Sequence, residues 1–324
     1  MLLPSTIESP SATGMTHKVL ALIALPEMAL QALRAAYDLR YEPNRALQAA
    51  LFEQSELSHF RAVLTNGSRG LSALEMDKMP HLEIVSTYGV GYENVDIEHA
   101  RERGIRVSHC PGANDDTVAD HALGMMLCLA RGFHRADPRV RLGHWEDARE
   151  ERPTLNLSRL GLLGLGRIGS KIALRAQAFG MAIHYHTPVP KTVPWSYCSC
   201  VLDLAQSSDF LVLACPGGKA TWHAVNAQVL QALGPQGYLV NIARGSVVQT
   251  DALVQALKGG VIAGAALDVF ENEPHIDADL LACDNALFTP HMSGRSPAAY
   301  RVQTDILMNN WQLQFSAQMP LYVL

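Results

Sequence analysis

A chain of 324 residues is longer than one hydrophobic core usually organises, so the sequence predicts two domains. An apolar fraction of 48%, a charged fraction of 18% and a net charge of −5 are those of an ordinary globular protein, and they exclude the basic footprint of a nucleic-acid-binding or membrane-surface protein. No apolar stretch is long enough to span a membrane.

The N-terminal half reads as an α/β domain. Residues 1–16 lack the basic start and long apolar core of a signal peptide, and we expect them to be disordered. From Lys18, short apolar runs alternate with amphipathic stretches, which predicts a parallel sheet with helices on its faces. In chain order these segments are KVLALIAL, EMALQALRAA, RAVLTNG, HLEIVSTYG, IEHARERG and IRVSH.

A second alternating block begins near Asn114. The run from Thr117 to Asp120 has the form of a capping box before a long apolar segment, 117–135. Beyond it we expect strands at DFLVLACP, GYLVNIARG, VIAGAALDVF and ALFTPH, and helices at NAQVLQALG and TDALVQALKGG. A last helix is expected from Ala298 to about Gln314.

The middle of the chain carries a dinucleotide signature. Residues 160–169 read LGLLGLGRIG, with three glycines at the GxGxxG spacing between a strand-like run and a helical pattern. Gly164 permits the tight turn, Gly166 lets the backbone approach a pyrophosphate, and Gly169 lets helix and strand pack closely. The N–H groups at the start of the helix then face the anion.

Because this motif lies in mid-chain, we predict an insertion. The expected fold is α/β: a Rossmann-type dinucleotide-binding domain at 114–293, inserted into a second, flavodoxin-like parallel α/β substrate domain made of 1–113 and 294–324. The chain would cross between the domains near Ala113 and Ser293.

The segment after the motif favours a phosphorylated ribose. NAD-selective sites place an acidic side chain roughly 20 residues beyond the first glycine, but no Asp or Glu occurs between Glu151 and Asp203. Lys191, His186 and the Thr187 hydroxyl would instead attract a 2′-phosphate, so NADP(H) is the preferred cofactor and NAD(H) a possible one. The alternative is that these side chains are solvated loop residues and the site accepts either cofactor.

Three polar side chains follow apolar runs near predicted strand ends. They are Arg244 after LVNIA, Glu273 after ALDVFEN and His291 after ALFTP. Ligands of open parallel sheets bind beyond the carboxyl ends of the strands, so all three are expected at one crevice. Each also has an ordinary structural explanation, as a surface arginine, a turn glutamate or a core histidine.

Together, several motifs resemble those of D-2-hydroxyacid dehydrogenases, particularly glyoxylate/hydroxypyruvate reductases. They are YGVGYENVD (88–96), PGANDDTVADHALGMML (111–127), GLGRIG (164–169), ACPGG (214–218), NIARGSVV (241–248), AALDVFENEP (265–274) and TPHMSG (289–294). The resemblance implies that Arg244, Glu273 and His291 are the catalytic residues. It also implies that Val90 and Gly91 bind the substrate carboxylate together with Arg244.

The resemblance further implies a set of cofactor contacts. Asp268 would contact the nicotinamide amide, and Arg167 and Ile168 the pyrophosphate. The remaining expected cofactor-binding residues are Thr117, Gly164, Gly166, Gly169, His186, Thr187, Lys191, Cys215, Pro216, Ala243, His291 and Gly294. NADP-using reductases of this kind often carry an Arg after the second strand of the nucleotide domain, where this chain has Thr187-Pro188.

The expected reaction is reduction of a small 2-oxo acid to the D-2-hydroxy acid. An arginine binds the carboxylate with paired hydrogen bonds and polarises the carbonyl, and a histidine donates the proton while Glu273 favours its charged form. Two rivals share the fold: a phosphite-type dehydrogenase, and a dinucleotide-sensing corepressor. Formate oxidation is disfavoured, because formate enzymes of this superfamily place Gln where Glu273 stands.

The remaining expectations concern partners and compartment. The six cysteines are scattered, so we expect them reduced in the cytoplasm, and Cys198-Ser199-Cys200 lacks a second pair for a metal site. The apolar segment 117–135 exceeds what one domain face needs, so with the resemblance it indicates a homodimer built on the nucleotide domains. No nucleic acid, membrane or metal partner is expected.

Overall fold

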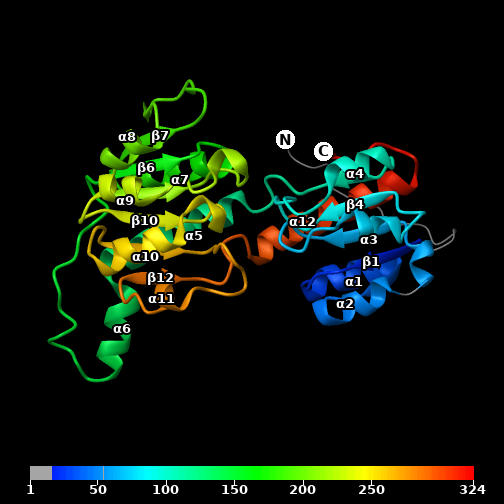
Figure 1. The fold of residues 1–324 in the computed structure, drawn as a ribbon, viewed down its shortest axis with the longest axis horizontal. Helices are drawn as coiled ribbons and strands as arrows, with labels where there is room; N and C mark the ends of the chain where they lie inside the picture. Colours follow the sequence, from blue (N-terminus) through cyan, green and yellow to red (C-terminus); the bar gives the residue numbers. More distant parts are fainter. Residues whose placement is uncertain (1–16, 54) are drawn as a thin grey trace. The chain divides into compact units, whose positions relative to one another are not determined.

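The structure, a computed structural model, describes residues 17–53 and 55–324. The chain forms two compact units (Figure 1). One ends at Asn114 and resumes at Ser296–Leu324, and the other is Asp115–Arg295. The expected disordered extension at 1–16 lies outside the described residues.

The unit that ends at Asn114 and resumes at Ser296–Leu324 is called unit 1. Its described part is built on a parallel sheet of five strands in the order β2-β1-β3-β4-β5. This is the flavodoxin-like order. The strands are β1 (Lys18–Ala21), β2 (Asp38–Tyr41), β3 (Ala62–Thr65), β4 (Ile84–Thr87) and β5 (Arg106–Ser108). The helices are α1 (Glu27–Ala36), α2 (Arg45–Phe52), α3 (Ala73–Asp77), α4 (Ile97–Glu102) and α12 (Pro297–Phe315), with a 3₁₀ turn η1 (Ser55–His59).

The C-terminal helix α12 completes the core of unit 1. Leu307 and Trp311 are buried against residues of β1, β4 and α1, and the Trp311 Nε1 donates to Ser86 Oγ at 2.9 Å. A buried indole needs such a partner for its N–H. The contact explains why the chain returns to unit 1 after unit 2 is complete.

Unit 2, Asp115–Arg295, holds a parallel sheet of seven strands in the order β12-β11-β10-β9-β6-β7-β8. The strands are β6 (Arg159–Leu163), β7 (Ala182–His186), β8 (Ser196–Tyr197), β9 (Phe210–Leu213), β10 (Tyr238–Asn241), β11 (Gly264–Leu267) and β12 (Ala286–Phe288). From β6 the chain runs outward to β8 and then returns to β9 on the other side of β6. This reversal is the topological switch point at which Rossmann folds bind dinucleotides.

Helices and 3₁₀ turns connect these strands. They are α5 (Asp115–Arg131), α6 (Phe133–Arg141), α7 (Arg167–Ala178), α8 (Val201–Gln206), η2 (Lys219–Thr221), α9 (Ala227–Leu233), η3 (Gly245–Val247), α10 (Thr250–Lys258) and α11 (Ala278–Leu281). Two apolar clusters form the core of the unit. Among the described residues, no helix combines the length and apolar character needed to cross a bilayer.

The segment 117–135 differs from the sequence-based interpretation in two ways. The helix begins at Asp115, so Thr117 lies in its first turn and does not cap it, while the Asp120 carboxylate accepts from Arg175 Nε at 2.7 Å. The apolar residues of α5, such as Leu123 and Met126, are buried in the core of unit 2. Their number therefore reflects internal packing and does not by itself indicate a dimer.

Candidate active site

Arg244 is presented by a turn that follows β10. The Asn241 side chain, which is fully buried, accepts from the Ala243 N–H at 3.0 Å and donates to the Arg244 carbonyl at 3.0 Å. Arg244 Nη1 donates to the Ala243 carbonyl at 2.6 Å. These bonds fix the backbone from which the guanidinium extends.

The Arg244 side chain passes directly over Gly217, in the loop after β9. A Cβ added to Gly217 would stand 2.8 Å from Arg244 Cγ, closer than real Cβ contacts. Cys215 of the same loop is half-buried; burial raises the pKa of its thiol to about 11, although the charge of Arg244 acts in the opposite direction. Arg244 is thus held between its own turn and the ACPGG loop.

Glu273 and His291 form a hydrogen-bonded pair at the ends of β11 and β12. His291 Nδ1 lies 2.7 Å from Glu273 Oε2, and the Phe270 N–H donates to Glu273 Oε1 at 3.0 Å. Burial alone would raise the pKa of the Glu273 carboxyl, but the hydrogen bond and charge of His291 and the Phe270 N–H lower it below its usual value. A carboxylate on Nδ1 leaves Nε2 as the atom that can pass a proton to a ligand.

The loop that carries His291 is fastened to Asp268. The Asp268 carboxylate, which has no exposed surface, accepts from Thr289 Oγ1 at 2.6 Å and from the Met292 and Ser293 N–H groups at 2.8 and 2.9 Å. The Asp268 carbonyl accepts from the His291 N–H at 2.8 Å. These bonds hold His291 in the left-handed backbone region, with φ of 48°. Asp268 was expected to contact the nicotinamide amide. In the structure its carboxylate anchors the loop that carries His291.

The glycine loop fits a dinucleotide. Gly164 has φ of +99°, and an added Cβ would lie 2.7 Å from the Ala214 carbonyl oxygen; at Gly169 it would lie 2.3 Å from the Gly164 oxygen. Both positions therefore require glycine. A Cβ at Gly166 would meet nothing within 4 Å, so the side of the loop on which a pyrophosphate would lie is open. Unit 2 thus has the cradle that the cofactor needs.

Arg167 and Ile168 form the first turn of α7, directly after this loop. Arg167 Nε donates to Asp115 Oδ2 at 2.8 Å, and Asp115 is buried at the start of α5. Ile168 is partly buried against the core of unit 2. Asp115 therefore orients the guanidinium that was expected at the pyrophosphate.

The three ribose candidates follow β7, and the structure uses each one differently. Lys191 Nζ donates to the Leu165 carbonyl at 2.6 Å, which brings the ammonium group to the glycine loop. His186 Nδ1 lies 2.9 Å from the Cys198 carbonyl. The Thr187 hydroxyl donates to the Val189 carbonyl at 2.7 Å, and Thr187 is buried. The Thr187 hydroxyl thus donates within its own turn, and its contact with a 2′-phosphate stays a prediction.

The other predicted residues divide between the units. Cys215, Pro216, Ala243 and Gly294 lie in loops after β9, β10 and β12, at the same sheet edge as the catalytic candidates, and Thr117 lies in α5. Val90 and Gly91 belong to unit 1, in the loop after β4, where His109 Nδ1 lies 3.1 Å from the Val90 carbonyl. Within the described ranges, no three His, Cys, Asp or Glu side chains gather as metal ligands would, and Cys200 Sγ accepts from the Asp203 N–H at the start of α8.

Comparison with known proteins decides the family. The sequence model of one protein family, described as "D-isomer specific 2-hydroxyacid dehydrogenase, NAD binding domain", matches residues 123–293. A glyoxylate/hydroxypyruvate reductase A of Arabidopsis thaliana is 39% identical over 267 residues, which cover 82% of this chain and 85% of that protein. The chain belongs to the D-isomer specific 2-hydroxyacid dehydrogenase family.

Other relatives of this dehydrogenase agree. A hydroxyphenylpyruvate reductase of Plectranthus scutellarioides is 38% identical over 281 residues, covering 86% of this chain and 89% of the relative. A crystal structure of an NADPH-dependent glyoxylate/hydroxypyruvate reductase from Sinorhizobium meliloti, in complex with NADP and malonate, is similar with a TM-score of 0.86 and 35% identity. The alignment covers 95% of this chain and 96% of that one. Residues 123–293 of unit 2 are thus the NAD-binding domain of this family.

Sequence reasoning missed several residues that hold the site of this dehydrogenase together. Asn241 and Asp115 lie inside the motifs at 241–248 and 111–127, but spacing does not encode the partners of their side chains. His121 Nε2 lies 3.1 Å from Thr289 Oγ1, which in turn donates to Asp268. The only sequence signal for His121 was a polar residue within an apolar helix.

Proposed function

We propose that this dehydrogenase reduces a small 2-oxo acid of the glyoxylate or hydroxypyruvate type to the D-2-hydroxy acid, with NADPH as the preferred reductant. The observation that carries the proposal is the Glu273–His291 pair, 2.7 Å apart at the strand ends of an NAD-binding domain that also presents Arg244. The names of the relatives support the substrate class.

The chain's own residues supply binding and the proton. Arg244 would donate paired hydrogen bonds to the substrate carboxylate and draw electron density from the adjacent carbonyl. The reduced nicotinamide supplies the hydride when bound. His291 Nε2 would donate a proton to the carbonyl oxygen as negative charge builds there, and Glu273 would hold the ring in place through Nδ1.

We assign unit 1 as the substrate domain and unit 2 as the dinucleotide-binding domain. Main-chain N–H groups at Val90 and Gly91 would bind the carboxylate without the bulk of a side chain. The His109 contact to the Val90 carbonyl supports this assignment, because it fixes the orientation of the peptide groups in that loop.

The preference for NADPH rests on charge near the glycine loop. Lys191 reaches the Leu165 carbonyl, next to the glycines, and its ammonium group carries three donors of which that bond uses one. No acidic residue occurs between Glu151 and Asp203 to repel a 2′-phosphate or bind the ribose hydroxyl. His186 would add a second donor when protonated.

We also propose a homodimer, built on unit 2. Its apolar contact would come from α6 and the segment after it, where Phe133 is 56%, Leu142 74% and Trp145 62% exposed. Light scattering should find a particle of two 35.3 kDa chains, and Leu142→Asp should shift it to one.

The six free thiols support a reducing compartment such as the cytoplasm.

One experiment separates this function from its rivals. NADPH and NADH consumption is measured with glyoxylate, hydroxypyruvate and phenylpyruvate, and NAD(P) reduction is measured with phosphite and with formate. We expect turnover of the 2-oxo acids and none with phosphite or formate. Tight dinucleotide binding without turnover of any substrate would favour the corepressor function and overturn the proposal.

A further inference from the structure

The structure assigns Glu271 as a positioning residue that fixes the loop of Glu273 relative to the loop of Arg244, through its contacts with His223 and Thr250. The inference rests on the proposed function and adds to it a residue that does not touch the substrate. Its basis is a set of contacts between three loops that follow β9, β10 and β11.

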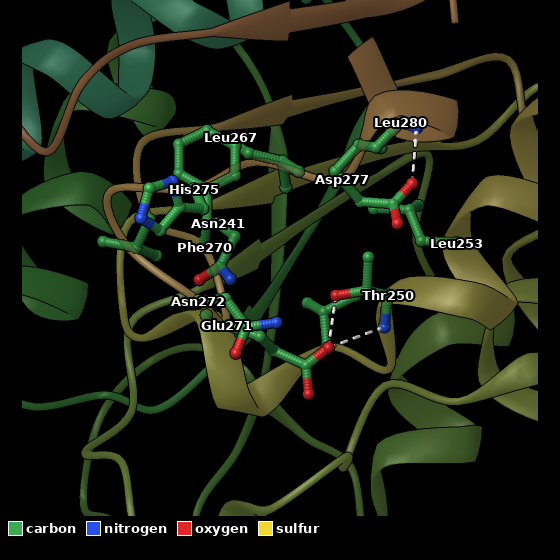
Figure 2. Close-up of a pocket in the computed structure, with 13 residues that line it drawn as sticks. Asn241, Thr250, Leu253, Leu267, Phe270, Glu271, Asn272, His275, Asp277 and Leu280 are labelled. Atoms are coloured by element: carbon green, nitrogen blue, oxygen red, sulfur yellow. Dashed lines mark hydrogen bonds between the residues drawn. The ribbon is translucent and has the colours of Figure 1, made fainter. Parts of the chain in front are cut away.

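The Glu271 carboxylate joins these loops. Its Oε1 accepts at 2.6 Å from Nε2 of His223, a residue of the loop after β9. Its Oε2 accepts from the Thr250 N–H at 3.2 Å and from the Thr250 hydroxyl, at the start of α10. Figure 2 shows the carboxylate turned towards Thr250, with both bonds drawn. Glu271 itself lies two residues before Glu273.

Glu271 takes the place of a helix cap. The N-cap residue of α10, Gln249, makes no side-chain cap bond, so the first N–H groups of that helix need an acceptor. A carboxylate at a helix N-terminus also interacts favourably with the helix dipole. Burial would raise the pKa of Glu271, but the bonds from Thr250 and His223 lower it, so the group acts as a charged acceptor.

His223 extends the connection to the Arg244 turn. Its N–H donates to the Ser246 carbonyl at 2.8 Å, and the Val225 N–H donates to the Val247 carbonyl at 3.0 Å. Both acceptors lie in η3, directly after Arg244. A path of hydrogen bonds therefore runs from η3 through His223 and Glu271 to the loop of Glu273.

The same two loops also touch backbone to backbone. A Cβ added to Gly245 would lie 1.9 Å from the Phe270 carbonyl carbon, so Gly245 and Phe270 are in direct contact. Phe270 in turn donates its N–H to Glu273. A shift of either loop is thus passed to the catalytic carboxylate.

Packing does not hold this region by itself. A cavity is bordered by Gly245, Thr250, Glu271 and Asn272, among other residues (Figure 2). The cavity lies beside the contact between Gly245 and Phe270, so packing holds only part of the boundary between the loops. The Glu271 hydrogen bonds hold the rest. Loss of the carboxylate would leave Arg244 and the Glu273–His291 pair less well aligned for one substrate.

The test compares Glu271→Ala with Asn272→Ala in the whole 324-residue chain. Asn272 lines the same cavity, and within the part of the chain that the structure describes its side chain makes no hydrogen bond. We expect Glu271→Ala to lower kcat with hydroxypyruvate about tenfold or more while the Kd for NADPH stays within about twofold, because misplacing catalytic groups by about 1 Å costs that much or more. Asn272→Ala should keep kcat within about twofold of the unmodified protein.

A second pair of variants keeps the test independent of folding. His223→Gln retains a donor and should keep most of the activity. The kcat of His223→Ala should match that of Glu271→Ala. The double variant that combines His223→Ala with Glu271→Ala should be no slower than either single variant. Additive losses, or an unchanged kcat in Glu271→Ala, would overturn the inference, as would equal losses of NADPH binding and kcat. If the unmodified protein reduces no 2-oxo acid, the proposed function fails instead.

Discussion

Replacement of Arg244 by Ala tests the role of this guanidinium in binding the substrate. Two charge-assisted hydrogen bonds to a carboxylate are worth about 1.5–3 kcal/mol each, so about 3–6 kcal/mol would be lost in full. The side chain is only partly buried, so solvent replaces part of that interaction. We therefore expect the lower half of the range, a fall of about 10² to 10³ in kcat/KM.

The assay is steady-state reduction of hydroxypyruvate with saturating NADPH, together with NADPH binding measured directly. Binding should be unchanged, because the glycine loop and not Arg244 forms the phosphate cradle. The kcat/KM of Arg244→Lys should lie between those of the unmodified protein and Arg244→Ala, since lysine keeps the charge and loses the paired geometry. Arg34→Ala, on the exposed face of α1, is the matched control. An Arg244→Ala enzyme with more than about a tenth of normal kcat/KM, a loss under about 1.4 kcal/mol, would refute the assignment.

The remaining predictions concern four other side chains. His291→Asn should lower kcat far more than it raises KM; equal effects on both would argue against a proton donor. Because Glu273 and His291 share a hydrogen bond, Glu273→Gln should move the loss of reductase activity at rising pH to lower pH, and superimposable pH profiles would show that the two groups are not coupled. Lys191→Ala should lower kcat/KM with NADPH several-fold, which corresponds to about 1 kcal/mol of transition-state stabilisation. The kcat/KM with NADH should stay within about twofold. In unit 1, burial would raise the pKa of Glu75, but Arg69 and Ser72 lower it. The Glu75 carboxylate therefore contributes its full stability above the unfolded pKa of about 4.3, and that contribution is lost as pH falls through the folded pKa. Glu75→Gln should lower the unfolding temperature by about 3 °C near neutral pH and by progressively less as pH falls below about 4.3.

The features that the sequence predicts well are local ones. Gly164, Gly166 and Gly169 follow a spacing set by one turn, and Arg244, Glu273 and His291 each come shortly after an apolar strand. The alternating pattern also predicts both parallel sheets, although β2 (DLRY) and α2 were missed because they are short and largely exposed.

The features that were missed depend on contacts between distant segments. His121 and Thr289 are 168 positions apart, and His223 and Glu271 are 48 apart, so no periodicity relates them. For a related reason, the sequence does not show which apolar residues of 117–135 pack inside their own unit. Helix α5 contacts α7 on one side and the sheet on another, and it ends where Gly132 takes a left-handed conformation with φ of +66°.

Stereospecific reduction of a 2-oxo acid by hydride transfer can be checked by analysing the product. Hydroxypyruvate is incubated with the enzyme and a limiting amount of NADPH, and the glycerate formed is resolved into its two enantiomers. We expect D-glycerate alone, in a one-to-one ratio to the NADPH oxidised. L-Glycerate, a racemic product, or NADPH that stays bound and unoxidised would contradict it.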